Sequence, residues 1–182
     1  NWCYAFHHKE AIRCFTKTIE LDPSCVMGYW GVAYATGPYY NIPWEKMSPS
    51  GRPEAIRICY EYSQKAKELR ETTPLLEVEK VLCDALAVRF QANKANEIEE
   101  LKKWDDDYAD AMRLVYRDFS DDYDVCALTA EALVVRTPWQ LWDLKNRTPA
   151  EGTFTEEAIE IVEKALGRIE EEKHTPHAGL LH

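Results

Sequence analysis

A recurring spacing of small and bulky residues is the feature that most limits how this chain can fold. Ala11 is followed four positions later by Phe15, and Pro23 comes shortly after them. In a second run, Tyr29 is followed four positions later by Ala33. Small residues let two helices approach closely, and aromatic rings fill the space beside them. Because proline cannot continue a helix, Pro23 separates two helices. The spacing therefore predicts antiparallel helix pairs.

The same spacing returns along the whole chain. Glu-Ala-Ile begins a helical pattern at 10–12, 54–56 and 157–159, and weaker copies start at Tyr108 and Cys126. Apolar residues recur at the helical period, and no stretch alternates with period two long enough to predict a strand. We therefore expect an all-α fold without a sheet. The expected helices cover residues 9–21, 24–37, 52–71, 74–92, 97–118, 122–136 and 155–172, and a further one starts near 177.

Three details refine this expectation at the helix ends. We expect Trp2 to lie near the end of a preceding helix, because the repeat has an aromatic residue nine positions before the small residue that Ala11 provides. Asp121 and Thr155 are the expected N-caps of the helices that follow them, since their side-chain oxygens can accept from free backbone N–H groups. Both ends of the chain interrupt helical patterns, which predicts that residues 1–182 are one array within a longer protein.

These motifs resemble the tetratricopeptide repeat (TPR), a helical hairpin that stacks into a solenoid. The resemblance implies one TPR-like solenoid over residues 1–182. The chain is similar to a subgroup of long TPR proteins that have His-x-Glu-Ala, Gly-Pro-x-Tyr-Asn, Thr-Pro-Trp and His-x-Gly-x-x-His segments. This chain has His7 where the subgroup has Asn and Ala178 where it has Pro. The matching segments are 8–11, 37–41, 137–139 and 177–182.

Two departures from the regular repeat predict long loops within the repeats. Ala55 follows Thr36 by 19 positions and Ala158 follows Leu133 by 25, where a regular repeat has nine. Both insertions are rich in proline and aromatic residues, which argues against disorder. We expect both loops to lie on the same edge of the array and to fold onto it, burying Tyr40, Trp44, Trp139 and Trp142.

Composition narrows the possible partners. The net charge of -10 argues against a nucleic-acid backbone or an anionic membrane surface. No apolar run is long enough to span a membrane. The six cysteines are spread singly without a Cys-x-x-Cys pair, which predicts reduced thiols and a cytoplasmic protein. The oligomeric state stays open.

By resemblance, the first helix of each pair lines a concave groove. The implied groove positions hold aromatic and acidic residues rather than the Lys, Arg and Asn of TPR domains that clamp a carboxylate. We therefore expect a protein or peptide ligand with apolar or cationic character. The alternative is that Trp30 and Tyr34 are packed beneath the first loop. The implied groove positions are Met27, Trp30, Tyr34, Asp124, Ala127, Glu131 and Val134. The candidate ligand-binding residues are Trp30, Tyr34, Tyr40, Asn41, Trp44, Glu131, Trp139 and Trp142.

The five histidines all lie near the two chain ends. His8, His177 and His182 are candidate ligands for a transition metal, which needs at least three such donors. They would meet only if the array curls back on itself or if further chain completes the site, and surface or capping roles are the simpler explanation. The main interpretation is a protein-interaction scaffold without a cofactor. The alternatives are the N-terminal part of a His-dependent, metal-dependent enzyme and a structural array that drives oligomerisation.

Overall fold

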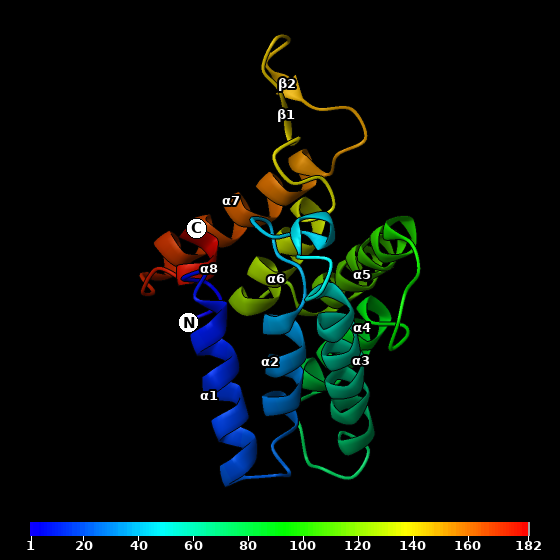
Figure 1. The fold of residues 1–182 in the computed structure, drawn as a ribbon. Helices are drawn as coiled ribbons and strands as arrows, with labels where there is room; N and C mark the ends of the chain where they lie inside the picture. Colours follow the sequence, from blue (N-terminus) through cyan, green and yellow to red (C-terminus); the bar gives the residue numbers. More distant parts are fainter. Residues whose placement is uncertain (182) are drawn as a thin grey trace.

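The computed structural model describes residues 1–181, and most of them are helical (Figure 1). The α-helices are α1 (His8–Leu21), α2 (Val26–Thr36), α3 (Arg52–Leu69), α4 (Glu77–Arg89), α5 (Ile98–Phe119), α6 (Tyr123–Val134), α7 (Thr155–Glu172) and α8 (Ala178–Leu181). A single 3-10 turn, η1 (Trp44–Lys46), and two short strands, β1 (Trp142–Asp143) and β2 (Thr148–Pro149), complete the elements. The expected all-α class is confirmed, and the helices expected between residues 9 and 181 are all present.

The helix ends differ from the predicted ones by three residues at most. The start of α4 is later than predicted because Glu79 accepts a hydrogen bond from the backbone N–H of Leu76 at 2.9 Å. The prediction that Asp121 caps α6 is wrong. Asp122 caps α6 instead, accepting from the Val125 N–H at 3.0 Å. Thr155 is the first residue of α7 rather than its cap.

Two expectations about local structure are wrong. Residues 2–6 form turns instead of the end of a helix, and Phe6 has a left-handed φ of 53°. A small antiparallel sheet does exist, in which Trp142 pairs with Pro149. Its turn is stabilised by Asp143, whose carboxylate accepts from the backbone N–H groups of Lys145 and Asn146. Such local side-chain chemistry forms a turn without any long alternating pattern.

Each helix packs mainly on its neighbours in the chain, in order from α1 to α7, while α8 lies on α6 and α7. Small residues permit this approach. Ala33 is fully buried, and a Cβ at Gly31 would lie 2.3 Å from the ring of Phe15. One apolar core lies among α2 to α6, and a second joins α6, α7 and α8. In the described part of the chain, no helix has both the length and the apolar character of a membrane span.

The two inserted loops leave the helices at the same end of the molecule, drawn in cyan and yellow in Figure 1. The hydroxyl of Tyr40 in the first loop accepts from the backbone N–H of Trp139 in the second at 2.9 Å. Trp44 is buried, with 1% of its surface exposed. The burial expected for the second loop is wrong, because Trp139 is 54% exposed and Trp142 is 43% exposed.

Candidate functional site

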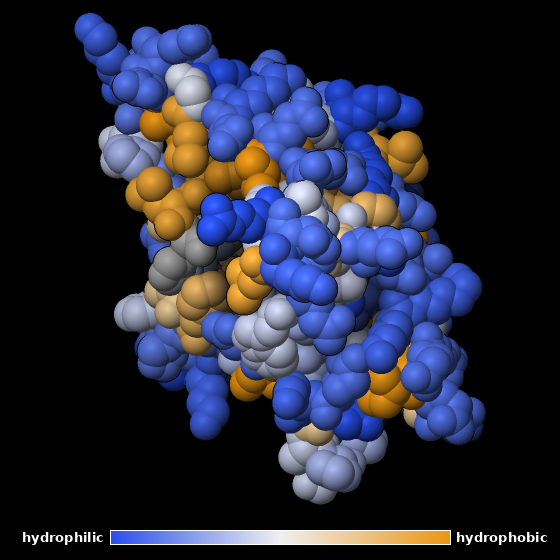
Figure 2. Space-filling model, turned by 90° about the horizontal axis from the view of Figure 1, so that it is seen from above, coloured by the Kyte–Doolittle hydropathy of each residue, from blue (hydrophilic) through white to orange (hydrophobic). Residues whose placement is uncertain are grey.

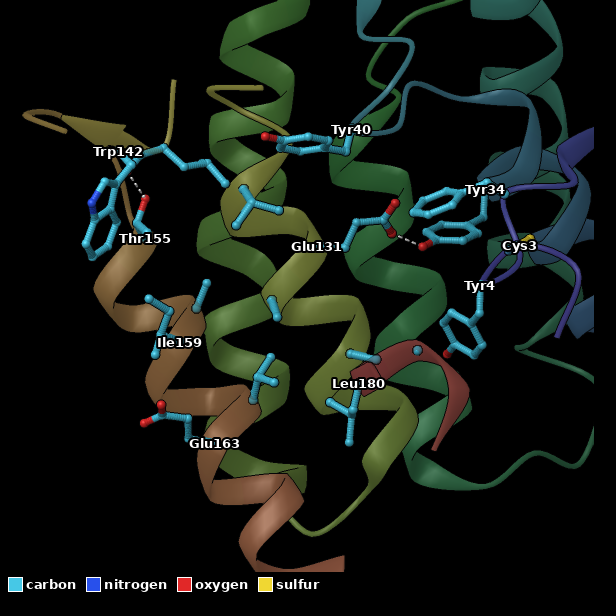
Figure 3. A pocket seen from close by; sticks show the side chains of 18 residues that line it. Cys3, Tyr4, Tyr34, Tyr40, Glu131, Trp142, Thr155, Ile159, Glu163 and Leu180 are labelled. Carbon is cyan, nitrogen blue, oxygen red and sulfur yellow. Dashed lines mark hydrogen bonds between the residues drawn. The ribbon is translucent and has the colours of Figure 1, made fainter. Parts of the chain in front are cut away.

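A cavity of about 660 Å³ opens between α2, α6, α7 and α8 beneath the two loops (Figure 3). Its walls are mainly aliphatic and aromatic, and their only acidic side chains among the described residues are Glu131 and Glu163. Ligand sites in proteins typically have volumes of about 300 to 1,000 Å³. The lining residues are Cys3, Tyr4, Phe6, Tyr34, Tyr40, Ala127, Ala130, Glu131, Val134, Leu141, Trp142, Thr155, Ala158, Ile159, Val162, Glu163, Gly179 and Leu180.

Helix α6 forms the base of the cavity. Its lining residues Ala127, Ala130, Glu131 and Val134 follow the i, i+3, i+4, i+7 spacing that places side chains on one face of a helix. Because the side chains of the two alanines are short, they leave space between this face of α6 and the opposite wall. Facing it, α7 contributes a stripe from Thr155 to Glu163. The cavity therefore results from small residues on one helix and an apolar stripe on the next.

Glu131 and Tyr34 form the polar centre of the cavity, and they come from two helices that are distant in the sequence. The Tyr34 hydroxyl donates a hydrogen bond to the Glu131 carboxylate (Figure 3). Burial raises the pKa of Glu131, while the Tyr34 hydrogen bond and the Arg89 guanidinium lower it. Burial and the nearby Glu131 charge raise the pKa of Tyr34, so its hydroxyl stays a donor. The centre therefore offers an acceptor to a ligand that brings a further donor.

The first residues of the chain and α8 close one end of the cavity. The ring of Tyr4 lies edge-on to His177, with 5.2 Å between ring centroids, and its hydroxyl donates to Asp124. Nε2 of His177 lies 3.2 Å from the same carboxylate. A Cβ at Gly179 would come within 2.7 Å of the Tyr4 ring. Glycine at this position thus allows the two ends of the array to meet.

The predicted ligand-binding residues fall into three groups. Four of them line the cavity: Tyr34, Tyr40, Glu131 and Trp142. Two lie in the core, namely Trp30 and Trp44. Asn41 and Trp139 are exposed on the loops and do not line the cavity.

Trp30 and Tyr34 pack together in the core, and only Tyr34 also lines the cavity. The rings stack with 4.9 Å between centroids and 13° between planes. The Trp30 indole N–H donates to the buried carbonyl of Leu82 at 3.1 Å, so this residue supports Tyr34 from behind. Of the other implied groove positions, Ala127 and Val134 line the cavity and Met27 packs against the core.

Sequence reasoning missed the contribution of α7, α8 and the first residues of the chain. One signal was available in α7, which carries two apolar stripes instead of one. Ala158, Ile161 and Ala165 are buried against the second core, while Ile159 and Val162 line the cavity. A helix that packs on one neighbour needs only the first stripe. No pattern indicated that residues 3–6 turn back onto α8.

The thiol and imidazole groups nearest the cavity and the first loop are packed against other side chains. Burial raises the pKa of the Cys3 thiol to about 11, which keeps it protonated. The His8 ring stacks on Tyr39 with 3.8 Å between centroids, and His177 lies beside Tyr4. No group of three His, Cys, Asp or Glu side chains in the described chain is placed to hold a metal ion. The third candidate, His182, lies outside the described residues.

Comparison with known proteins found no family, no curated protein and no solved structure that matches this chain. The resemblance to TPR proteins therefore rests on the motifs alone. The function has to be argued from the chemistry of the cavity.

Proposed function

We propose that this protein is an interaction module, a TPR-like array of helix pairs that binds a peptide segment of a partner in the cavity beneath the loops. The observation that carries the proposal is the cavity itself. Its lining comes from seven separate parts of the chain, and its polar centre is the carboxylate of Glu131. Apolar walls with a few convergent polar groups are typical of binding sites.

Support for a TPR-like array comes from the packing of each helix on the next one in the chain. Further support is that α2, α6 and α8 all contribute to the cavity. The motif register implied groove positions on α2 and α6, and the resemblance places first helices on the concave side. The second-helix pattern of α7 did not imply its place in the cavity. Tyr34 and Glu131 occupy positions for which the register implied a place in the groove.

The chemistry of the cavity specifies what the peptide brings. An aliphatic or aromatic side chain fits between Tyr34 and Ile159, and burying it contributes roughly 1.5–3 kcal/mol. A donor next to that side chain meets Glu131, and a hydrogen bond to a charged group contributes about 1.5–3 kcal/mol. Association itself costs at least about 4 kcal/mol. One anchor therefore gives weak binding, and useful affinity needs contacts outside the cavity.

A phage-displayed library of random 12-residue peptides tests the proposal. We expect selected peptides to share one large apolar residue. Measured by fluorescence anisotropy, their affinity should fall at least about tenfold in Ala130→Leu, which fills the cavity, and less in Glu131→Gln. Circular dichroism should show unchanged helicity in both variants.

Two matched controls separate the cavity from the rest of the surface. Ala178→Leu adds the same bulk on an exposed face of α8, and Tyr29→Phe removes a hydroxyl that donates to the Pro23 carbonyl at 3.1 Å. Neither change should alter binding. Selection of no peptide, or equal binding to the Ala130→Leu variant, would contradict the proposed function.

A further inference from the structure

A second hollow of about 540 Å³ adjoins the cavity on the outer face of α7. Trp142, Ile159 and Glu163 line both spaces, so they form the ridge between them. The two apolar residues of the ridge are accessible, because Trp142 is 43% exposed and Ile159 is 40% exposed. Seen from the loop end of the molecule, hydrophobic residues form an exposed patch within a largely hydrophilic surface (Figure 2). A ligand that fills the cavity can thus continue over the ridge.

The second hollow is acidic. Glu156, Glu160 and Glu163 line it at an i, i+4, i+7 spacing, which places them on one stripe of α7. No described residue forms an ion pair with any of the three. Glu157 on the same helix differs, because its carboxylate pairs with Arg113 at 2.6 Å. Lys164 also lines the hollow, so the three glutamates leave it with an excess of negative charge that faces whatever crosses the ridge.

We infer that the partner segment is basic, with an apolar anchor for the cavity and Lys or Arg side chains that lie along the α7 stripe. This inference rests on the proposed function and specifies the partner of the same site. A cation that crosses the ridge also meets the face of Trp142, which attracts positive charge. An acidic partner would meet like charge from the stripe and from Glu131, which disfavours it.

The length of the stripe sets the size of the segment. Seven residues along a helix span about 10 Å at 1.5 Å per residue. An extended peptide covers this distance with about three residues, and a helical one with about seven. One or two basic side chains close to the apolar anchor are enough to occupy the stripe.

The same 12-residue phage library tests this inference with two further variants. On the unmodified protein we expect Lys and Arg to be enriched beside the apolar anchor. On a Glu156→Gln, Glu160→Gln, Glu163→Gln triple variant, the anchor should remain while the basic enrichment disappears. The matched control changes three exposed glutamates away from the stripe, Glu151→Gln, Glu170→Gln and Glu171→Gln, and should retain both features.

Affinity measurements give the quantitative outcome. The dissociation constant of a selected basic peptide should rise about tenfold in the stripe variant at low salt, and the difference should shrink as salt screens the charges. Equal losses in the stripe and control variants would overturn the inference, because they would report net charge only. Selection of peptides that have the apolar anchor but no basic residues would overturn the inference and leave the proposed function standing. Selection of no peptide would overturn both.

Discussion

The two inserted loops have similar compositions, but one buries its tryptophan and the other leaves its tryptophans exposed. Both carry prolines and two or more aromatic residues, and both leave the helices at the same end (Figure 1). The loop at 37–51 buries Trp44 almost completely. The loop at 135–154 leaves Trp139 and Trp142 about half exposed. Aromatic content alone therefore does not determine whether a loop joins the core.

Two arginines, of which Arg89 is buried, explain how the first loop is held. Arg89 is buried and pairs with Asp105 at 3.0 Å, and its second nitrogen donates to the Pro38 carbonyl at 2.9 Å. Arg52 donates to the carbonyl of Trp44 at 2.8 Å. These bonds satisfy backbone acceptors that would otherwise be costly to bury. Trp44 can then pack edge-on against Phe90 with 6.4 Å between ring centroids.

The second loop is held mainly by its own residues. The carboxylate of Asp143 closes the hairpin, and the Thr155 hydroxyl donates to the Leu141 carbonyl at 2.8 Å. No buried cation of the described chain donates to its backbone. Its aromatic rings consequently remain at the surface, where Trp142 borders the cavity and the acidic hollow. One loop buries its tryptophan in the core, and the other leaves its aromatic rings on the surface that we propose as part of the binding site.

Replacing one tryptophan in each loop should separate these roles most strongly. Trp44→Ala removes a fully buried ring, and we expect the free energy of unfolding to fall by about 3–5 kcal/mol. Trp142→Ala removes an exposed ring, and the change should stay within about 0.5 kcal/mol. Urea denaturation followed by circular dichroism measures both. Comparable losses in the two variants would mean that the second loop also belongs to the core.

Most of the fold could be predicted from the sequence, because the helices follow local spacing. Ala11, Ala33 and Ala158 are buried as the pattern required. The hairpin could not be predicted from alternation, since Asp143 forms it through its own side chain. The later start of α4 likewise depends on a single hydrogen bond from Leu76 to Glu79. Local capping chemistry overrides periodicity at such ends.

The candidate site was predictable only in part. Tyr34 and Glu131 could be placed in one groove because each lies on a helix whose register the motifs fixed. Trp142 lines the cavity through a loop whose path no spacing specifies. Tyr4 and Leu180 contribute because the chain ends meet, which depends on the curvature of the whole array. Local sequence patterns carry no information about contacts between the two ends of the chain.

The hydrogen bond between the loops provides a finer test of the comparison. Tyr40→Phe keeps the ring and removes the hydroxyl that accepts from the Trp139 N–H. We expect a loss of about 0.5–1.5 kcal/mol of stability, the net value of one hydrogen bond. Native-state proteolysis should accelerate within 137–153 and stay unchanged within 38–50, since Arg89 still holds the first loop. Faster cleavage in both loops would show that they are stabilised as one unit.

The smallest expected effect is a pH dependence confined to the first loop. The neutral ring of His8 stacks on Tyr39 of that loop, and its Nδ1 lies 3.2 Å from the Ala35 carbonyl. Burial, with a further contribution from Arg89, lowers the pKa of His8 below its usual value of 6.5. As the pH falls through 6.5, the unfolded chain gains a proton at this site before the folded chain does. The free energy of unfolding should therefore decrease there and level off below the folded pKa.

Comparing His8→Phe with a surface histidine variant isolates this dependence. His8→Phe retains an aromatic partner for Tyr39 but cannot titrate, so its stability should change less between pH 7.5 and 5.5 than that of the unmodified protein. His174→Gln, which alters an exposed histidine beside Glu172 and outside the first loop, is the matched control. Proteolysis at pH 5.5 should increase within 38–50 and not within 137–153, because the partly buried imidazole of His8 stacks on Tyr39 of the first loop. An unmodified slope in His8→Phe would place the pH dependence elsewhere in the protein.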